Sequence, residues 1–316
     1  MKNEQIIGTS HGKIILMGEH SVVYGHPSIA LPFPAVHMEA TIKPANEATI
    51  IDCSYYSGIA DDMPEVLQSL KTAIETALLS LDKENEKLMI SVNSTIPPER
   101  GMGSSAAVAV AITRAIYHYY HQPLSHQRLL ELVDVSEKIA HGNPSGLDAI
   151  MTSGDHPVFY RKGHPFVEFD LRLDGYLVVA DTGVTGQTKA AVGSIASRLE
   201  TNEKQKTKQQ IEKLGLLAEK ARTYLETNQP IALGQAMSEA HDLLSDLGVS
   251  STELNRLVEA GKEAGALGAK LTGGGRGGCM IALAANKNAA DKISQALLNS
   301  GAVKTWITYL NEEVKV

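Results

Sequence analysis

The part of the sequence that decides the fold is Pro97-Pro98-Glu99-Arg100-Gly101-Met102-Gly103-Ser104-Ser105-Ala106-Ala107, which leads into a largely apolar run ending at Tyr120. Glycine has no Cβ, so a glycine-rich loop lets backbone amides approach a ligand closely. The two serines fall where a helix would begin, and the free N–H groups and the dipole at that end of a helix favour anions. The stretch predicts a phosphate-binding loop before a buried helix over 104–120, with a tight turn and a serine cap as the alternative.

Two other nucleotide-binding motifs fit the residue pattern of this sequence in part, but the residues or the secondary structure predicted around them do not fit. Gly101-x-Gly103-x-x-Ala106 and Gly273-x-Gly275-x-x-Gly278 both fit the dinucleotide fingerprint, which requires a strand, a tight turn and a helix in that order. Two prolines separate the first match from the preceding strand, and the second match leads into a strand. Gly12-Lys13 resembles the end of a Walker loop, but Ile14 stands where a serine or threonine should bind magnesium. A Rossmann site and a P-loop are therefore excluded.

Hydrophobic periodicity predicts helices and strands that do not alternate strictly. Strands are expected over 13–17, 28–31, 37–43, 88–92, 176–180, 279–284 and 303–310. Helices are expected over 65–81, 104–120, 127–140, 203–227, 231–247, 252–264 and 287–299. Pro32 and Pro34 are expected to separate the second strand from the third, because proline cannot donate to a sheet ladder. The mixture predicts an α+β fold in two domains, 1–172 and 173–316.

Composition and charge argue against several classes of protein. The chain has 316 residues, of which 43% are hydrophobic, so it can build a large core, and two modest domains are expected. Its net charge of -7 and its pI near 5.9 argue against nucleic-acid binding. Cys53 and Cys279 are too few for a disulfide framework or a zinc cage. Neither a signal peptide nor a membrane span is expected, and the protein is predicted to be cytoplasmic.

Two further clusters of polar residues could serve phosphoryl transfer. Lys13 stands early in an apolar strand that is followed by Gly18-Glu19-His20. Glu137 lies on a predicted helix, and Asp148 follows it beyond a turn rich in glycine, proline and serine. Phosphoryl transfer needs a magnesium clamp, cations for the phosphate oxygens and a group that deprotonates the attacking hydroxyl. These residues could supply all three, although Lys13 at a strand end in water and Glu137 on the surface are the structural alternatives.

Taken together, three motifs in order resemble those of the GHMP kinase superfamily. They are Gly12-Lys13…Gly18-Glu19-His20-x-Val22-Val23-x-Gly25, Gly101-Met102-Gly103-Ser104-Ser105-Ala106-Ala107, and Leu271-Thr272-Gly273-Gly274-Gly275-Arg276-Gly277-Gly278-Cys279. The element His141-Gly142-Asn143-Pro144-Ser145-Gly146-Leu147-Asp148 is more particular and resembles the mevalonate kinase family. The resemblance covers the whole chain. It implies an N-terminal domain like ribosomal S5 domain 2, a ferredoxin-like C-terminal domain, and a site in the cleft between them.

The resemblance also implies a reaction and a role for each matched residue. The reaction would be ATP- and Mg²⁺-dependent phosphorylation of mevalonate to 5-phosphomevalonate, a step of isoprenoid precursor biosynthesis, and a homodimer is compatible with the sequence. Asp148 would be the base with Lys13 as its partner, and Ser105 and Glu137 would hold Mg²⁺. ATP would be bound by Pro98, Arg100, Gly101, Met102, Gly103, Ser104, Ser105 and Ala106, among which residues 101–106 form the phosphate loop. Substrate-side groups would be Glu19, His20 and Thr188, and a third glycine loop (residues 273–278), with Gly273, Gly274 and Gly275, would close the site.

Three places depart from the superfamily pattern. Ser10-His11 stands where Ala-Pro is common before Gly-Lys. Glu99-Arg100 replaces small residues before the phosphate loop, and Arg276 replaces a glycine in the third glycine loop. None of the three removes a predicted catalytic group, but Arg276 changes the charge and shape of its loop.

Two other kinds of function stay open at this point. A sibling enzyme, phosphomevalonate kinase or homoserine kinase, would share the fold, although the former needs more cations for its phosphorylated substrate. Galactokinase is disfavoured, because Ser21-Val22-Val23 follows His20. A catalytically inactive nucleotide-binding sensor would also share the fold, so fold alone does not exclude it. The presence of Lys13, Glu137 and Asp148 argues against a sensor.

Overall fold

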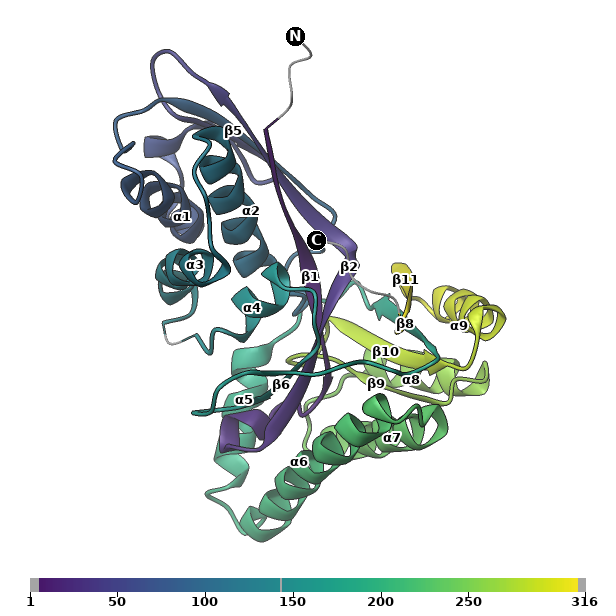
Figure 1. Ribbon diagram of the computed structural model, residues 1–316. Helices are drawn as coiled ribbons and strands as arrows, with labels where there is room; N and C mark the ends of the chain where they lie inside the picture. Colours follow the sequence, from purple (N-terminus) through teal and green to yellow (C-terminus); the bar gives the residue numbers. More distant parts are fainter. Residues whose placement is uncertain (1–5, 143, 312–316) are drawn as a thin grey trace.

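The computed structural model describes residues 6–142 and 144–311, which form two sheets with helices packed on them (Figure 1). The first sheet has the order β4-β3-β5-β2-β6-β7, with β1 paired to β2, and it is antiparallel except between β3 and β5. Its strands are β1 (Ile7–Met17), β2 (Pro27–Pro44), β3 (Ile50–Cys53), β4 (Tyr56–Ile59), β5 (Leu88–Ser94), β6 (Val158–Arg161) and β7 (Val167–Glu168). The second sheet is antiparallel with the order β11-β8-β10-β9. Its strands are β8 (Tyr176–Asp181), β9 (Gly268–Leu271), β10 (Cys279–Ala284) and β11 (Lys304–Tyr309).

The helices fall into two groups by their position in the chain. Those of the first half are α1 (Gln68–Leu79), α2 (Ser104–Tyr119), α3 (His126–His141) and α4 (Leu147–Ser153), with short 3₁₀ helices at Ser21–Tyr24, Ala60–Asp62 and Glu65–Leu67. Those of the second half are α5 (Thr188–Arg198), α6 (Lys204–Glu226), α7 (Pro230–Asp246), α8 (Thr252–Glu263) and α9 (Lys287–Asn299). None of the helices in the described part of the chain is both long and apolar enough to cross a lipid bilayer. The α+β fold predicted from the sequence is confirmed.

Helix α2 is the central helix of the first half. It contacts β1 and β2 as well as α1, α3 and α4, and Figure 1 shows these helices grouped beside the long strands. The approach to β1 is close, since a Cβ added to Gly8 would lie 2.1 Å from the carbonyl oxygen of Ala111. At the start of the helix, the backbone N–H of Lys13 donates to the carbonyl oxygen of Met102 over 3.1 Å. Packing of α2 therefore holds the glycine-rich loop against the strand that carries Lys13.

One expectation about the strands is wrong. The sequence predicts separate strands on either side of Pro32 and Pro34, but β2 continues through both. One edge of β2 pairs with β1, while the other pairs with β6 over residues 27–30 and with β5 over residues 38–44. Within the described part of the chain, residues 31–37 have no ladder partner on that second edge, and Pro34 lies within a register shift of the β1–β2 ladder. Proline is tolerated there, because no ladder needs its missing N–H.

The two sheets come from consecutive parts of the chain. Strands of the first sheet lie between residues 7 and 168, and those of the second between residues 176 and 309. Helices α7 and α8 pack on β9, and α9 packs on β8 and β11. We propose that the domain boundary lies between residues 172 and 173, in the connection from β7 to β8.

Candidate active site

A cavity of about 1090 Å³ is lined by residues of both halves of the chain. The predicted site residues that line it are Lys13, Glu19, His20, Gly101, Gly103, Ser104, Ser105, Glu137, Asp148, Thr188, Gly273 and Gly274. They come from β1 and the turn after it, the phosphate loop, the starts of α2, α4 and α5, the last part of α3, and the third glycine loop. The fold thus brings most of the predicted site residues to one cavity.

Lys13 and Asp148 form an ion pair in this cavity. The Lys13 Nζ lies 3.0 Å from Oδ1 of Asp148, and 8% of the lysine side chain and 38% of the aspartate side chain are exposed. Lys13 lies in the middle of β1, not at a strand end, and Asp148 is in the first turn of α4. The pair therefore presents one ammonium and one accessible carboxylate to any molecule in the cavity.

Ser105 and Glu137 form a second polar pair in the cavity wall. The Ser105 hydroxyl donates to Oε1 of Glu137 over 2.7 Å, and Glu137 is only 4% exposed. Burial raises the pKa of the Glu137 carboxyl, and the hydrogen bond from Ser105 opposes this rise. The alternative of a surface glutamate is therefore wrong for Glu137.

The residues predicted to bind ATP do not all face the cavity. Gly101 and Gly103 line it with a φ of 76° each, a backbone conformation that suits glycine. The side chain of Met102 is buried in the core, and Ala106 is fully buried in α2. Pro98, Met102 and Ala106 are not among the residues that line the cavity. Whether they contribute backbone groups to ATP stays a prediction.

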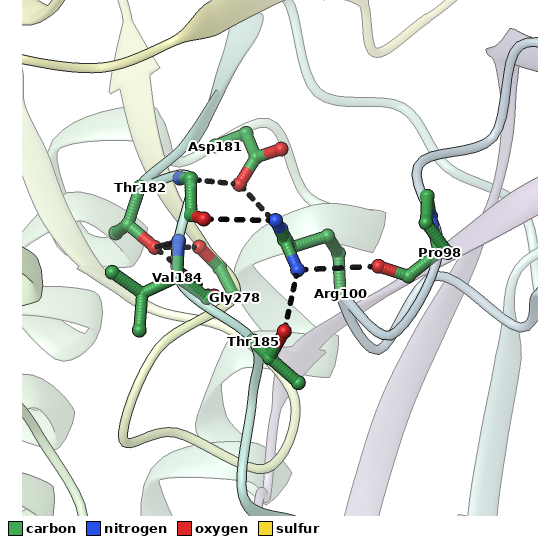
Figure 2. Close-up of polar contacts among 8 residues, drawn as sticks. Pro98, Arg100, Asp181, Thr182, Val184, Thr185 and Gly278 are labelled. Carbon is green, nitrogen blue, oxygen red and sulfur yellow. Dashed lines mark hydrogen bonds and ion pairs between the residues drawn. The ribbon is translucent and has the colours of Figure 1, made fainter.

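The Arg100 side chain does not line the cavity and binds the end of β8 and the segment that follows it (Figure 2). Its Nε donates to Oδ1 of Asp181 over 2.8 Å, and its other nitrogens donate to Thr185 Oγ1 and to the carbonyl oxygens of Pro98 and Gly183. The Arg100 side chain is 14% exposed and that of Asp181 is 6% exposed. Arg100 also lines a smaller pocket of about 120 Å³ next to the third glycine loop.

Replacement of Arg100 tests whether its side chain stabilises the fold or contacts ATP directly. We expect Arg100→Gln to lower the free energy of unfolding of the ligand-free protein by about 1–3 kcal/mol, because Asp181 would remain buried without its charged partner. Denaturant unfolding measures this loss. Arg172→Gln is the matched control, since its pair with Asp170 is exposed. Weaker ATP binding with unchanged stability would instead indicate that Arg100 contacts the phosphates.

The substrate-side residues predicted from the sequence also meet in the cavity. Glu19 and His20 are 3% and 5% exposed, and His20 has a φ of 61°, which is uncommon for a residue other than glycine. Nε2 of His20 lies 3.1 Å from the carbonyl oxygen of Gly274. Thr188 begins α5 and packs on the same glycine, since a Cβ added to Gly274 would lie 1.8 Å from Thr188 Oγ1. Any larger residue at position 274 would clash with Thr188.

Arg276 does not enter the cavity. Its Nε donates to the carbonyl oxygen of Gly248 over 3.2 Å, and its Nη2 donates to Ser194 Oγ over 2.8 Å. Its own N–H donates to the carbonyl oxygen of Val249. The extra charge in the third glycine loop therefore ties that loop to α5 and to the turn after α7. Gly275 packs there as well, because a Cβ added to it would lie 2.0 Å from the Val249 carbonyl oxygen.

Sequence reasoning missed two buried charged residues near the site. Asp181 ends β8 and holds Arg100, and Lys270 on β9 is fully buried beside Glu19. The sequence signal that could have identified them is a single charged residue within or at the end of an otherwise apolar strand. Such a residue is seldom buried without a partner.

Comparison with known proteins identifies the family. Residues 68–154 match the family model described as GHMP kinases N terminal domain, and residues 221–303 match the one described as GHMP kinases C terminal. A mevalonate kinase of Pyrococcus furiosus is 35% identical over an alignment of 308 residues, with coverage of 90% of this chain and 90% of that one. The chain belongs to the mevalonate kinase family of GHMP kinases.

Solved structures of other mevalonate kinases agree with this family membership. The enzyme of methicillin-resistant Staphylococcus aureus is 35% identical, with a TM-score of 0.77 and coverage of 98% of this chain and 99% of that one. The L. major mevalonate kinase in complex with R-mevalonate is 28% identical, with a TM-score of 0.83 and coverage of 98% and 97%. This GHMP kinase therefore shares its two-domain fold with mevalonate kinases over nearly its full length.

Proposed function

We propose that this GHMP kinase transfers the γ-phosphoryl group of ATP to the C5 hydroxyl of mevalonate. The observation that carries the proposal is the Lys13–Asp148 pair, with 3.0 Å between Nζ and Oδ1, which faces the same cavity as the phosphate loop and the Ser105–Glu137 pair. Phosphoryl transfer needs these components together: donors and cations for the phosphates, and an acceptor for the hydroxyl proton. The names of the relatives support mevalonate as the substrate.

Asp148 would act as the base of this reaction. As the hydroxyl oxygen of mevalonate forms a bond to the γ-phosphorus, its proton passes to a carboxylate oxygen of Asp148. The bond from that phosphorus to the β–γ bridging oxygen breaks, and ADP leaves. The Lys13 ammonium lies beside the carboxylate and would stabilise the negative charge that develops on the attacking oxygen. The pair would therefore activate and orient the hydroxyl together.

The phosphate loop would hold the triphosphate of ATP. Gly101 and Gly103 leave room for phosphate oxygens near the backbone, and Ser104 and Ser105 begin α2, whose free N–H groups would favour an anion. Val66, Ser69 and Leu130 also line the cavity and offer a mixture of apolar and hydroxyl groups suited to a nucleoside.

The Ser105–Glu137 pair fits Mg²⁺. Both groups offer oxygen, the donor that Mg²⁺ prefers, and Mg²⁺ typically takes one or two carboxylates together with phosphates and water. The described residues contain no group of three or more histidine, cysteine, aspartate or glutamate side chains that could hold a metal alone. We infer that Ser105 and Glu137 would hold Mg²⁺ together with the phosphates, and the bound ion would neutralise phosphate charge.

Replacement of Glu137 tests the magnesium site. We expect Glu137→Gln to raise the Mg²⁺ concentration for half-maximal rate by at least about 10-fold, a loss typical even for groups that only support a metal ligand. A magnesium titration of the initial rate measures it. Glu131→Gln on the exposed side of the same helix is the control. Lost activity that excess magnesium does not restore, with normal ATP affinity, would assign Glu137 to the chemistry instead.

A substrate panel tests the function itself. ATP consumption is measured with mevalonate, phosphomevalonate, homoserine and galactose, and we expect turnover with mevalonate. Preference for phosphomevalonate or homoserine would favour a sibling kinase, and ligand binding without turnover would favour a sensor. The family membership favours neither alternative. A cytoplasmic location and a homodimer stay predictions from the sequence.

A further inference from the structure

A buried ion pair joins the two halves of the chain beside the cavity. Lys270 of β9 donates from Nζ to Oε1 of Glu19, which follows β1, and to the carbonyl oxygen of Leu271 over 2.6 Å. The side chains of the pair are 0% and 1% exposed. A buried charge is costly without a partner, so each residue requires the other. Glu19 lines the cavity, and Lys270 lies behind it.

Two atoms next to this pair have no hydrogen-bond partner among the described residues. They are Oε2 of Glu19 and Nδ1 of His20, both buried. Nε2 of His20 faces the carbonyl oxygen of Gly274, which can only accept, so Nε2 carries the proton and Nδ1 has a lone pair. Burial lowers the pKa of His20 to about 4, so the ring is neutral at pH 7. With Glu19 ionised, both partnerless atoms are acceptors.

We propose that Lys270 is a positioning residue that holds Glu19 as an ionised acceptor, so that Glu19 and His20 select a hydroxyl group of the substrate. Two acceptors attract a donor and disfavour a carboxylate or a phosphate. Mevalonate carries a hydroxyl at C3 besides the one at C5, and the inference that the C3 hydroxyl binds here rests on the proposed function. Lys270 does not itself touch the substrate.

The charge state of Glu19 depends mainly on Lys270. Burial raises the pKa of Glu19, and the Lys270 ammonium is the largest effect that opposes this rise. The other titratable or charged groups near the pair are Lys13 on β1, His20, His241 on α7 and Arg276 in the third glycine loop. His241 is neutral at pH 7, because burial lowers its pKa to about 4. Loss of the Lys270 ammonium therefore raises the pKa of Glu19 further and favours its protonated form, a weaker acceptor.

The test compares mevalonate with its 3-deoxy analogue, which lacks the second hydroxyl. In the wild-type enzyme we expect kcat/KM to favour mevalonate on the order of 100-fold, as a lost hydrogen bond to a charged group implies. In Lys270→Met we expect this preference to fall at least about 10-fold at pH 7, with KM for ATP unchanged. Lys304→Met is the control, because Lys304 lies exposed on β11 of the same sheet.

The pH profile separates positioning from a purely structural role. A carboxyl is ionised above its pKa, so kcat/KM for mevalonate falls as the pH drops through the pKa of Glu19. Because the pKa of Glu19 is higher in Lys270→Met, we expect the midpoint of this fall at higher pH than in the wild type. Glu19→Gln should lack this part of the profile, since glutamine does not titrate.

The double variant Glu19→Gln/Lys270→Met buries no unpaired charge, so it applies even if Lys270→Met alone does not fold. If Lys270 acts through Glu19, the double variant should match Glu19→Gln in substrate preference within about threefold. The inference is overturned by equal wild-type use of both substrates, by unchanged preference and pH midpoint in folded Lys270→Met, or by further loss of preference in the double variant. A wild-type enzyme without turnover of mevalonate overturns the proposed function, and this inference with it.

Discussion

Asp148→Asn is expected to lose phosphorylation rate by about 100- to 10,000-fold, the usual cost of removing a general base. Asparagine keeps the size of the side chain and its position in the first turn of α4, so Mg-ATP binding and the fold should stay near normal. Single-turnover phosphorylation of mevalonate measures the chemical step directly. Asp155→Asn is the control, because Asp155 is an exposed carboxylate near the end of the same helix that does not line the cavity.

Lys13 should act with Asp148 as one unit. We expect Lys13→Met to lose rate comparably and the double variant to be far less than multiplicatively worse, because residues that act together are non-additive. Their contact of 3.0 Å is the structural basis of this expectation. If Asp148→Asn keeps more than about a tenth of the wild-type rate, well above the range for a lost base, Asp148 only positions the substrate.

Gly103→Val is expected to weaken ATP binding most strongly among the loop variants. The φ of 76° at Gly103 costs a valine roughly 1–3 kcal/mol, which is about 5- to 150-fold in binding if the loop must change to relieve it. In addition, a Cβ there would lie 3.0 Å from Lys13 Cγ and from Thr152 Cγ2. The added methyl groups would occupy the space proposed for the phosphates or displace Lys13. Titration with a non-hydrolysable ATP analogue measures the loss.

A matched control exists in the turn between β6 and β7. Gly163 has a φ of 80° with nothing within 4 Å of an added Cβ, so Gly163→Val introduces the same strain without crowding the site. It should lower stability but leave ATP affinity unchanged. Normal ATP affinity in Gly103→Val would contradict the assignment of the phosphate loop. Ser105→Ala should be milder in ATP binding and severe in rate, if its oxygen reaches the metal.

Much of the site could be predicted because its motifs are local. A glycine-rich segment before an apolar helical run predicts both the loop and the start of α2. The positive φ values of Gly101 and Gly103 agree with that prediction. Residues carried over by motif position, such as Lys13 and Asp148, line the same cavity. The resemblance supplied their pairing, since nothing in the spacing of residues 13 and 148 indicates a contact.

The directions of the long charged side chains could not be predicted in the same way. Arg100 stands within the phosphate-loop motif, yet its guanidinium binds Asp181, which is 81 positions away. Arg276 stands in the third glycine loop, yet it binds α5 and the turn after α7. A long charged side chain can adopt several rotamers. Which one it adopts depends on the buried polar partner that the tertiary structure places within its reach.

The sequence by itself determined the fold class, the glycine-rich loop before α2 and most of the helices, because these depend on periodicity and on backbone preferences within a few residues. Only the tertiary structure decided that β2 continues through Pro32 and Pro34, since that depends on which edge of the strand lacks a ladder partner. It also decided that Lys270 meets Glu19. The reason is physical: a buried charge is stable only where the fold excludes water and supplies the opposite charge, and segments 251 positions apart supply both here.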